Sequence, residues 1–341
     1  MTLAKSGEYE VHIIGFPSIN APTENAITVH PMVSFSRFSF KRFVAGFQIL
    51  RRTLDIKPDV IIINTPELLP VAIVNRLFFG RKIIYDVLEN YFRNIRYTTA
   101  YPAFARWPLA LMVRLLEKIT APLIHHFFLA ETGYRQEIGF ARSYTILENK
   151  LPKSIIQSYK SNQPRENHRL LFSGTLAEST GVFEAIELCK ELHKIDTAYS
   201  LTLIGYCAMP DTLAEIKRNI ADKPFITLVG GDQLVPHEQI LHEISRAGWG
   251  IVIYPPNPST ESSIPTKVYE YLAFQLPMII RHTTPSHAMV QEYKGGIILP
   301  AKPDFQVLIG QLKTFPKNPD APADIFWESE GLRLIECLRK L

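Results

Sequence analysis

A lysine and a glutamate, Lys267 and Glu270, lie three residues apart and closely follow Pro265. Proline is favoured in the first turn of a helix, because the backbone N–H groups there have no partner within the helix. Residues 264–274 therefore predict a helix that is entered through a proline. Its first turns would carry a cation and a carboxylate on one face, beside free N–H groups and the positive end of the helix dipole.

This pattern suits the binding of a nucleotide-sugar. A helix start and a lysine can hold a diphosphate, and a carboxylate can accept hydrogen bonds from ribose hydroxyl groups. The same residues are also typical of a capped surface helix in which Lys267 and Glu270 form an ion pair. The segment alone leaves both interpretations open.

A second candidate is the loop that follows the apolar run 170–173. Gly174 and Gly181 would let the backbone approach a ligand, and Ser179 and Thr180 can cap the helix that follows. A phosphate could rest at this helix start. The loop lacks the glycine spacing and the Gly-Lys-Ser/Thr end of a Walker loop, and an ordinary strand–turn–helix connection explains it as well.

Two histidines, His237 and His242, lie five residues apart in the segment 230–243. Metalloprotease helices place two histidines four residues apart, which puts both on one face, so this spacing does not predict a zinc site. We expect instead a loop and a helix start near the base of a nucleotide. No metal site is predicted elsewhere in the chain.

In the first half of the chain, polar side chains follow two neighbouring apolar runs, where strands would end. They are Asn64, Glu67, Asp86 and Glu89. Ligands of parallel sheets bind at the carboxyl ends of the strands, so these groups are candidates for binding the hydroxyl groups of an acceptor. They could instead cap the helices that follow.

Two segments of the first half, 35–57 and 101–121, predict basic amphipathic helices. In the first, apolar side chains share a helix face that lysines and arginines flank, and the second is similar. Such helices can lie on an anionic membrane, or they can pack against a sheet of their own domain. No nucleic-acid motif is present, so no nucleic-acid partner is expected.

Short apolar runs alternate with longer amphipathic stretches, which predicts parallel βαβ units. The runs expected to form strands are 11–16, 60–63, 82–85, 127–130, 170–173, 200–204, 226–229, 249–254, 278–281 and 296–299. The polar stretch 158–167 predicts a linker. We therefore expect an α/β protein of two doubly wound, Rossmann-like domains, 1–157 and 158–324, that bind ligands in a cleft between them. Residues 325–341 predict an amphipathic terminal helix.

Size and composition fit a globular protein with two cores. The chain has 341 residues, of which 46% are hydrophobic and 21% charged. Residues 1–150 carry 18 Lys and Arg against 12 Asp and Glu, and the remainder carries 19 against 21, so one half is expected to meet an anionic surface or substrate. Three well-separated cysteines, no secretory signal and no apolar run of ~18 residues predict a reduced, cytoplasmic protein.

Several of these segments form a familiar pattern when they are taken in order. They are Ser173-Gly174-Thr175, Tyr254-Pro255-Pro256, residues 265–273 followed by Pro277, residues 66–70, Tyr85-Asp86-Val87, and Trp327-Glu328 with the final helix. Together they resemble the glycosyltransferase family 4 type, the group 1 glycosyltransferases whose two Rossmann-like domains form the GT-B fold. The resemblance spans nearly the whole chain.

The resemblance implies a nucleotide-diphosphate sugar held by the second domain, an acceptor on the first, a helix 325–341 that returns to the first domain, and no metal or other cofactor. Glu270 would bind the donor ribose and Lys267 the diphosphate, with Glu89 as a third catalytic candidate. The implied donor-binding set is Gly174, Thr175, Thr180, Tyr254, Thr266, Lys267 and Glu270. The acceptor-binding set is Asn64, Glu67 and Glu89. Transfer would retain the anomeric configuration, with stabilisation of the leaving diphosphate.

The chain departs from the family pattern at several positions. A glutamate is often found eight residues before Glu270, where this chain has Ser262. Cations often found in the glycine loop are replaced by Thr175 and Thr180, and Leu88 lies in the stretch where a histidine is often found. Lys267 would then be the main cation for the diphosphate, and the residue that contacts the sugar is left open.

The start of the chain, residues 2–15, resembles the end of the family's first helix and its second strand. The N-terminal domain would then lack its first strand, through a late start or a degenerate terminus. The missing strand would leave a sheet edge exposed.

We predict a cytoplasmic glycosyltransferase of the hexosyltransferase type. It would move a sugar from a nucleotide-sugar to a saccharide or lipid-linked acceptor in surface polysaccharide biosynthesis of the cell envelope, and could act as a peripheral protein on the inner face of the cell membrane. The alternative is a catalytically impaired relative that serves as a binding or scaffold subunit. Lys267 and Glu270 favour an enzyme, and the departures favour the alternative. A sugar-nucleotide epimerase on the same fold is a third possibility.

Overall fold

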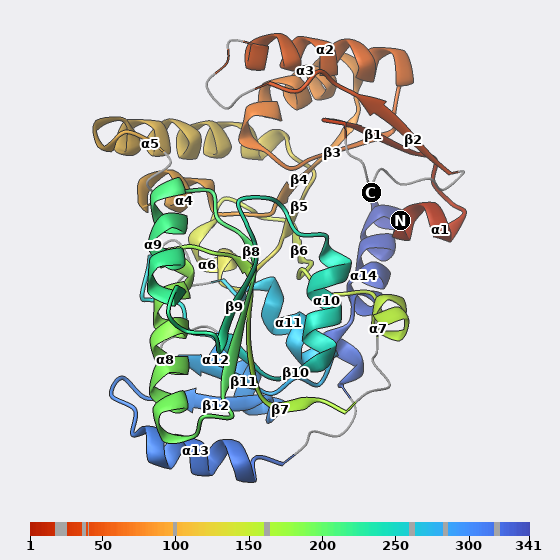
Figure 1. Ribbon diagram of the computed structural model, residues 1–341. Coiled ribbons are helices and arrows are strands. Elements are labelled where there is room, and N and C mark those ends of the chain that lie inside the picture. Colours follow the sequence, from red (N-terminus) through yellow and green to blue (C-terminus); the bar gives the residue numbers. More distant parts are fainter. Residues whose placement is uncertain are drawn as a thin grey trace. The chain divides into compact units, whose positions relative to one another are not determined.

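The computed structural model describes residues 1–17, 26–35, 39, 41–97, 101–159, 164–258, 263–281, 286–316 and 321–341. The chain forms two compact units (Figure 1). Unit 1 comprises residues 1–148 and 331–341, and unit 2 comprises residues 149–330. The chain therefore passes from unit 1 into unit 2 and returns to unit 1 for its final residues.

Unit 1 contains two parallel sheets. One pairs β1 (Val11–Gly15) with β2 (Ile27–Pro31), and the other has the order β3-β4-β5-β6. The strands of the second sheet are β3 (Val60–Ile63), β4 (Lys82–Val87), β5 (His126–Leu129) and β6 (Tyr144–Ile146). The described helices are α1 (Thr2–Ser6), α2 (Lys41–Ile56), α3 (Leu69–Phe79), α4 (Tyr91–Tyr97), α5 (Ala103–Thr120) and α6 (Tyr134–Glu137), with the 3-10 turns η1 (Pro66–Leu68) and η2 (Ala121–Leu123).

The central strands of unit 1 are covered on both faces, as is usual for parallel strands. On one face, Tyr85 of β4 and Phe127 of β5 belong to the main core of the unit. On the other face, Ile84 packs in a cluster with Leu338 of α14 (Trp327–Lys340). The amphipathic terminal helix that the sequence predicts therefore covers one face of the unit 1 sheet.

Unit 2 is built on a six-stranded parallel sheet with the order β12-β11-β10-β7-β8-β9. Its strands are β7 (Glu166–Thr175), β8 (Ser200–Tyr206), β9 (Ile226–Gly231), β10 (Ala247–Val252), β11 (Met278–Arg281) and β12 (Gly296–Leu299). The described helices are α7 (Lys153–Tyr159), α8 (Val182–Ile195), α9 (Pro210–Ile220), α10 (His237–Arg246), α11 (Thr266–Ala273), α12 (Ser286–Glu292) and α13 (Phe305–Thr314), with the 3-10 turns η3 (Glu178–Thr180) and η4 (Ala323–Ile325). In this doubly wound order the strand sequence reverses between β7 and β10, and ligands of such sheets bind where that reversal occurs.

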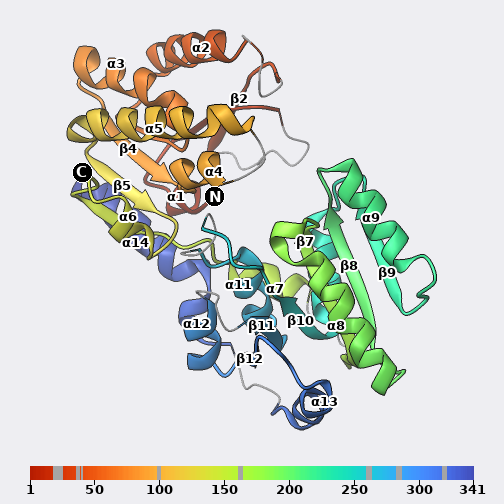
Figure 2. The same cartoon turned by 90° about the vertical axis from the view of Figure 1, so that its left-hand side faces the viewer.

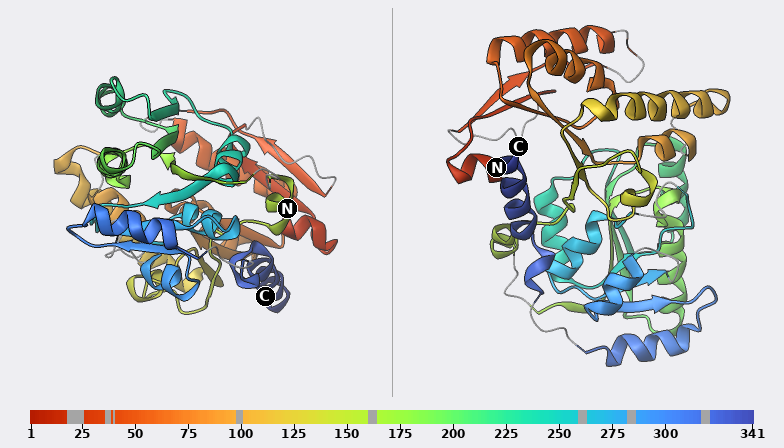
Figure 3. Two further views of the ribbon diagram at one scale, coloured as in Figure 1. Left: turned by 60° about the horizontal axis from the view of Figure 1, so that its bottom comes forward. Right: turned by 180° about the vertical axis from the view of Figure 1, so that it is seen from behind.

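Helices cover both faces of the unit 2 sheet (Figures 2 and 3). On one face, Leu170 and Phe172 of β7 pack in a cluster with Ile186 of α8. On the other face, Leu171 packs in a second cluster with Val268 of α11. Because neighbouring residues of a strand point to opposite faces, β7 contributes to both cores.

The predicted fold class is confirmed, and each predicted apolar run overlaps one of the described strands. The sequence does not predict β2 and β6. The predicted linker 158–167 differs from the structure at both of its ends, because α7 runs to Tyr159 and β7 begins at Glu166. Residues 160–163 lie outside the described ranges.

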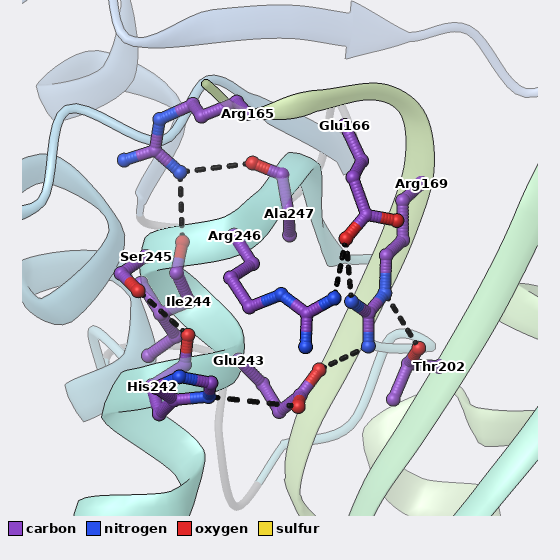
Figure 4. A network of polar contacts seen from close by, with 10 residues as sticks. All are labelled: Arg165, Glu166, Arg169, Thr202, His242, Glu243, Ile244, Ser245, Arg246 and Ala247. Atoms are coloured by element: carbon purple, nitrogen blue, oxygen red, sulfur yellow. Dashed lines mark hydrogen bonds and ion pairs between the residues drawn. The ribbon is translucent and has the colours of Figure 1, made fainter. Parts of the chain in front are cut away.

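A network of charged side chains explains why the start of β7 has a polar sequence (Figure 4). The Arg165 guanidinium donates hydrogen bonds of 2.7 and 2.8 Å to two backbone carbonyls where α10 ends. Arg169 and Arg246 both contact the Glu166 carboxylate, at 3.1 and 2.8 Å. These contacts fasten the start of β7 to α10, so the polar side chains mark a strand end instead of a linker.

The two amphipathic segments predicted in the first half form helices α2 and α5. Residues 36–38 and 40 of the first segment lie outside the described ranges. Among the helices in the described parts of the chain, none combines the length and the apolar character needed to cross a membrane.

Candidate functional site

The candidate site lies where β7 and β10 end, at the strand reversal of unit 2. Gly174, near the end of β7, has φ +98°, a left-handed conformation that favours glycine. A Cβ atom on Gly174 would lie 3.8 Å from Lys267 Cε, so the tip of the lysine side chain lies over this glycine. A Cβ atom on Gly181 would lie only 2.4 Å from the Ile253 carbonyl oxygen. The two glycines therefore let the loop after β7 close onto the chain that leaves β10 and onto Lys267.

Lys267 is a buried cation in the first turn of α11. The residue is 7% exposed, and its Nζ has no hydrogen-bond partner among the described residues. Nζ lies 4.2 Å from the centre of the Phe172 ring and 5.3 Å from that of Tyr254. These cation–π contacts replace part of the lost hydration, yet burial lowers the pKa of Lys267 to about 7, against the opposing effect of Glu270. An anion at Nζ would stabilise the charged form.

Glu270, one turn further along α11, is also buried and bonds to a histidine of α10. Its Oε1 lies 2.8 Å from His237 Nε2, and among the described residues this is the hydrogen bond that the Glu270 side chain makes. The hydrogen bond to Glu270 raises the pKa of His237, and partial burial opposes that shift. Burial, with a smaller contribution from Glu270, raises the pKa of Tyr254 to about 12. The arrangement leaves one carboxylate oxygen, in a fixed orientation, for a hydroxyl donor.

Tyr271 holds α11 on the sheet and so positions the two charged residues. Its hydroxyl lies 2.8 Å from Ser173 Oγ in a buried hydrogen bond. Its ring occupies the space above Gly250, where a Cβ atom would lie 2.4 Å from the ring. Because Tyr271 is anchored to both β7 and β10, the positions of Lys267 and Glu270 follow from the packing of α11.

Three threonines of the predicted donor-binding set have different surroundings. The Thr180 hydroxyl lies 2.8 Å from the backbone carbonyl oxygens of Thr175 and Ala177, so it helps to hold its own loop together. Thr175 and Thr266 are exposed, at the end of β7 and the start of α11. All three lie on the segments that border Lys267, and their roles in binding stay predictions.

The structure brings Gly174, Tyr254, Lys267 and Glu270 together at one end of the unit 2 sheet. Their predicted roles in donor binding remain predictions. Ser262, where the family often has a second glutamate, lies outside the described residues.

His237 is the residue of this site that the sequence analysis misses. The sequence invites a comparison of His237 with its neighbour His242, whereas its partner in the structure, Glu270, is 33 positions away. Its place at a helix start after a glycine pair is the one signal in the sequence. Among the described residues, no three His, Cys, Asp or Glu side chains gather so as to hold a metal ion.

In unit 1, the acceptor-binding candidates gather around Tyr91 at the carboxyl ends of β3 and β4. The Tyr91 hydroxyl donates a 2.8 Å hydrogen bond to the Asn64 backbone carbonyl. Burial raises the pKa of Tyr91, and the carboxylates of Glu89, Glu67 and Asp86 raise it further. Burial also raises the pKa of Asp86 to about 6. The structure thus brings the predicted residues together around a tyrosine that the sequence analysis does not single out.

Comparison with known proteins gives matches among solved structures. No family model matches the chain, and a search of curated proteins finds no match. Sucrose-phosphate synthase from Thermosynechococcus elongatus is 16% identical, with 99% of this chain and 90% of that chain covered and a TM-score of 0.70. HepE from Anabaena, in complex with UDP and glucose, is 12% identical, with 93% and 87% covered and a TM-score of 0.65. AviGT4, a glycosyltransferase involved in avilamycin A biosynthesis, is 16% identical, with 99% and 86% covered and a TM-score of 0.65.

At these identities the likeness shows the fold. The chain has the GT-B glycosyltransferase fold, with parallel doubly wound sheets, as the resemblance in the sequence implies. The fold that the resemblance in the sequence implies is therefore confirmed.

Proposed function

We propose that the protein is a glycosyltransferase that moves a sugar from a nucleotide diphosphate to a saccharide or lipid-linked acceptor. The observation that carries this proposal is the buried Lys267 ammonium, which lies over Gly174 without an acceptor among the described residues. A buried charge is unfavourable unless it is paired, and a diphosphate would supply the missing partner. The positive end of the α11 dipole favours the same ligand.

Each residue of the site has a role in this proposal. Lys267 binds the diphosphate and stabilises the negative charge that develops on it as the sugar leaves. Glu270 accepts a hydrogen bond from a ribose hydroxyl through Oε2, and His237 holds the carboxylate in orientation. Gly174 and Thr175 provide backbone close to the phosphates or the sugar.

The neighbours in fold support a particular choice of donor. HepE is described in complex with UDP and glucose, and a trehalose-6-phosphate enzyme from E. coli is described with UDP-2-fluoro glucose. A trehalose-6-phosphate synthase is described in a study of glycosyl transfer with retention. We therefore propose a hexosyl donor, with a uridine nucleotide as the first to test, and retention of configuration without a metal ion.

The acceptor belongs to unit 1 in this proposal. Asn64, Glu67 and Glu89 would bind its hydroxyl groups around Tyr91, and Glu89 is also the candidate for a catalytic contact. The product would be a surface polysaccharide of the cell envelope, made in the cytoplasm or at the inner face of the cell membrane. Support for the acceptor site is the convergence of these side chains at the strand ends.

Thermal unfolding with a panel of nucleoside diphosphates tests the donor site. A ligand that binds only the folded protein stabilises it by about 2.7 kcal/mol at 100 times its Kd, so at least one of UDP, GDP, ADP, CDP and TDP should raise the Tm. Lys267→Met should remove that shift, and Lys302→Met, at an exposed lysine of unit 2, should keep it. If no nucleotide raises the Tm of the wild-type protein, the proposal is wrong.

A catalytically impaired binding subunit is the second candidate. The sequence favours it through Thr175 and Thr180, which replace cations often found in the family loop. Both candidates predict nucleotide binding, but they differ in turnover. Release of UDP from UDP-sugars, measured with and without saccharide acceptors, supports the enzyme, whereas binding without release from any donor supports the subunit.

A further inference from the structure

The outward face of α5 is apolar along most of its length. Six large apolar side chains of this helix are between 44% and 87% exposed. They are Phe104, Trp107, Leu111, Met112, Leu115 and Ile119. Residues three or four positions apart share one face of a helix, so the six side chains form a continuous stripe. In Figure 1, α5 projects sideways beyond α2 and α3.

Buried polar contacts fix the rotation of α5, so the stripe cannot turn into the core of unit 1. Glu117, on the opposite face, is 2% exposed and accepts a 3.0 Å hydrogen bond from the Tyr85 hydroxyl. Arg114 lies 3.2 Å from the same carboxylate and donates a 2.8 Å hydrogen bond to Asn90 Oδ1. Rotation of the helix would leave these buried charges unpaired, which is strongly unfavourable. The fold of unit 1 therefore holds the apolar face outward.

A stripe of this extent indicates an interaction surface. Single exposed apolar side chains are ordinary on soluble proteins, but a continuous row is unusual. At 100° per residue the six side chains span about 140° of the helix circumference, which is broader than the narrow seam of a coiled coil. A broad apolar face suits the surface of a lipid phase better than a single partner helix.

Charge favours an anionic partner. The only acidic residue of α5, Glu117, is buried and paired, whereas the basic residues include the exposed Lys118. Unit 1 carries 20 Lys and Arg against 13 Asp and Glu, a net charge of +7, and unit 2 carries 17 against 20, a net charge of −3. Two copies of unit 1 would repel each other, whereas anionic headgroups would attract it.

Helix α2 of unit 1 repeats this composition on a smaller scale. Phe47 is 69% exposed, and Arg51 and Arg52 on the same helix are exposed as well. Aromatic and aliphatic side chains beside arginines and lysines are the composition of helices that lie in a membrane interface.

We propose that the outward face of α5 binds the anionic surface of a lipid bilayer. The six apolar side chains would lie at the boundary between headgroups and acyl chains, and the exposed Lys118, on the same side of the helix, would meet the phosphates. The surface belongs to unit 1 and the nucleotide site to unit 2, so lipid binding does not depend on the proposed transferase activity. Where both hold, unit 1 would meet a lipid-linked acceptor at the membrane.

Flotation of the full-length protein with vesicles tests the proposal. Vesicles of phosphatidylcholine with 30% phosphatidylglycerol should carry the protein upward, vesicles of phosphatidylcholine alone should carry at least tenfold less, and added salt should weaken the binding. The double variant Leu111→Gln/Leu115→Gln should lose at least tenfold in vesicle affinity. Leu332→Gln, at a 72% exposed leucine of α14, is the matched control and should bind as the wild type does.

Trp107 provides a direct reading of the contact. It is 55% exposed, whereas Trp249 is 4% exposed and the third tryptophan, Trp327 of α14, is half-buried, so we expect a blue shift of tryptophan fluorescence on addition of anionic vesicles to come mainly from Trp107. Trp107→Phe should abolish the shift and leave flotation nearly unchanged. The nucleotide-induced rise in Tm, which reports on unit 2, should be the same in all variants, and its presence confirms that each variant is folded.

Three results would overturn the proposal. One is a wild-type protein that does not float with anionic vesicles, and another is a double variant that floats as well as the wild type. The third is self-association without lipid that Leu111→Gln/Leu115→Gln abolishes, together with no vesicle binding, which would assign the face to a second copy of the chain.

Discussion

Each unit buries a charged side chain against the central strands of its sheet, but the two charges have different surroundings. In unit 1, Glu117 accepts a hydrogen bond from Tyr85 and pairs with Arg114. In unit 2, Lys267 has aromatic rings beside it and no acceptor among the described residues. Burial raises the pKa of Glu117 and lowers that of Lys267, so both sites disfavour the charge. The difference suggests that a charge paired by the protein serves the fold, and that an unpaired one serves a ligand.

The largest expected effect is on stability in unit 1. Glu117→Ala removes one partner of a buried pair and should lower the free energy of unfolding by about 3–5 kcal/mol. The nucleotide affinity of the folded protein should not change. Urea unfolding checks the first expectation, and Glu117→Gln, which can keep the hydrogen bond to Tyr85, should lose less. If the Glu117→Ala protein is as stable as the wild type, the claim that the buried Glu117 stabilises the fold is wrong.

The next effect is on activity in unit 2. Lys267→Met should lower transferase activity by about 10²–10³-fold, the usual loss when a group that stabilises developing negative charge is removed. Its free energy of unfolding should stay the same or rise, because an unpaired buried charge is replaced by an apolar side chain. Both expectations can be checked on one preparation of the variant: donor turnover measures the activity, and urea unfolding measures the free energy of unfolding. Full activity in this variant would exclude Lys267 from the chemistry.

A smaller effect is expected at the other charged residue of α11. Glu270→Gln should weaken binding of a ribonucleoside diphosphate about tenfold, since hydrogen bonds to charged groups contribute ~1.5–3 kcal/mol. Removal of the ribose hydroxyl that Glu270 binds should weaken wild-type binding equally and leave the variant unaffected. Calorimetric titration with UDP and its 2′-deoxy and 3′-deoxy analogues measures both. Equal discrimination by wild type and variant would place the ribose elsewhere.

A gradual effect is expected on the pH dependence of stability. Burial lowers the pKa of Lys267 from its ordinary 10.5 to about 7 in the folded protein, so between these values the unfolded chain binds more protons. The contribution of Lys267 therefore makes the ligand-free protein more stable as pH rises above 7, by at most about 1.4 kcal/mol per pH unit. Lys267→Met should lack this rise. The contribution of Lys267 is obtained by measuring the free energy of unfolding of the wild type and of the variant from pH 7 to 9 and taking the difference. Parallel pH profiles would show that Lys267 is charged without a ligand.

The strands that the sequence predicts are those with continuous apolar runs. Central strands of a parallel sheet are buried on both faces, which makes β4, β5, β7 and β10 apolar and easy to find. The three residues of β6 are all only partly buried, so they lack that signal. The polar start of β7 leads to the prediction of a linker. In the structure, Arg165 hydrogen-bonds to α10 and Glu166 forms an ion pair with it, and no local sequence pattern reveals such contacts.

The site is predictable where one short segment carries it. Lys267 and Glu270 are found by residue type and spacing, and Gly174 by its place after an apolar run. The partner His237 comes from another helix, and Tyr91 becomes relevant only because it lies among carboxylates from separate segments. Such contacts arise from the fold, so a single sequence does not display them.

The central claim is that a bound diphosphate pairs with the Lys267 ammonium group. The test is a calorimetric titration at pH 8.5 with UDP, or with the nucleotide that gives the largest rise in Tm. Repeating it in buffers of different ionisation enthalpy measures the number of protons that the protein takes up on binding. With a pKa of about 7 the free lysine is mostly neutral at this pH, so we predict uptake of about one proton per nucleotide by the wild type and none by Lys267→Met. Wild-type binding without proton uptake, or equal uptake by the variant, would contradict the claim.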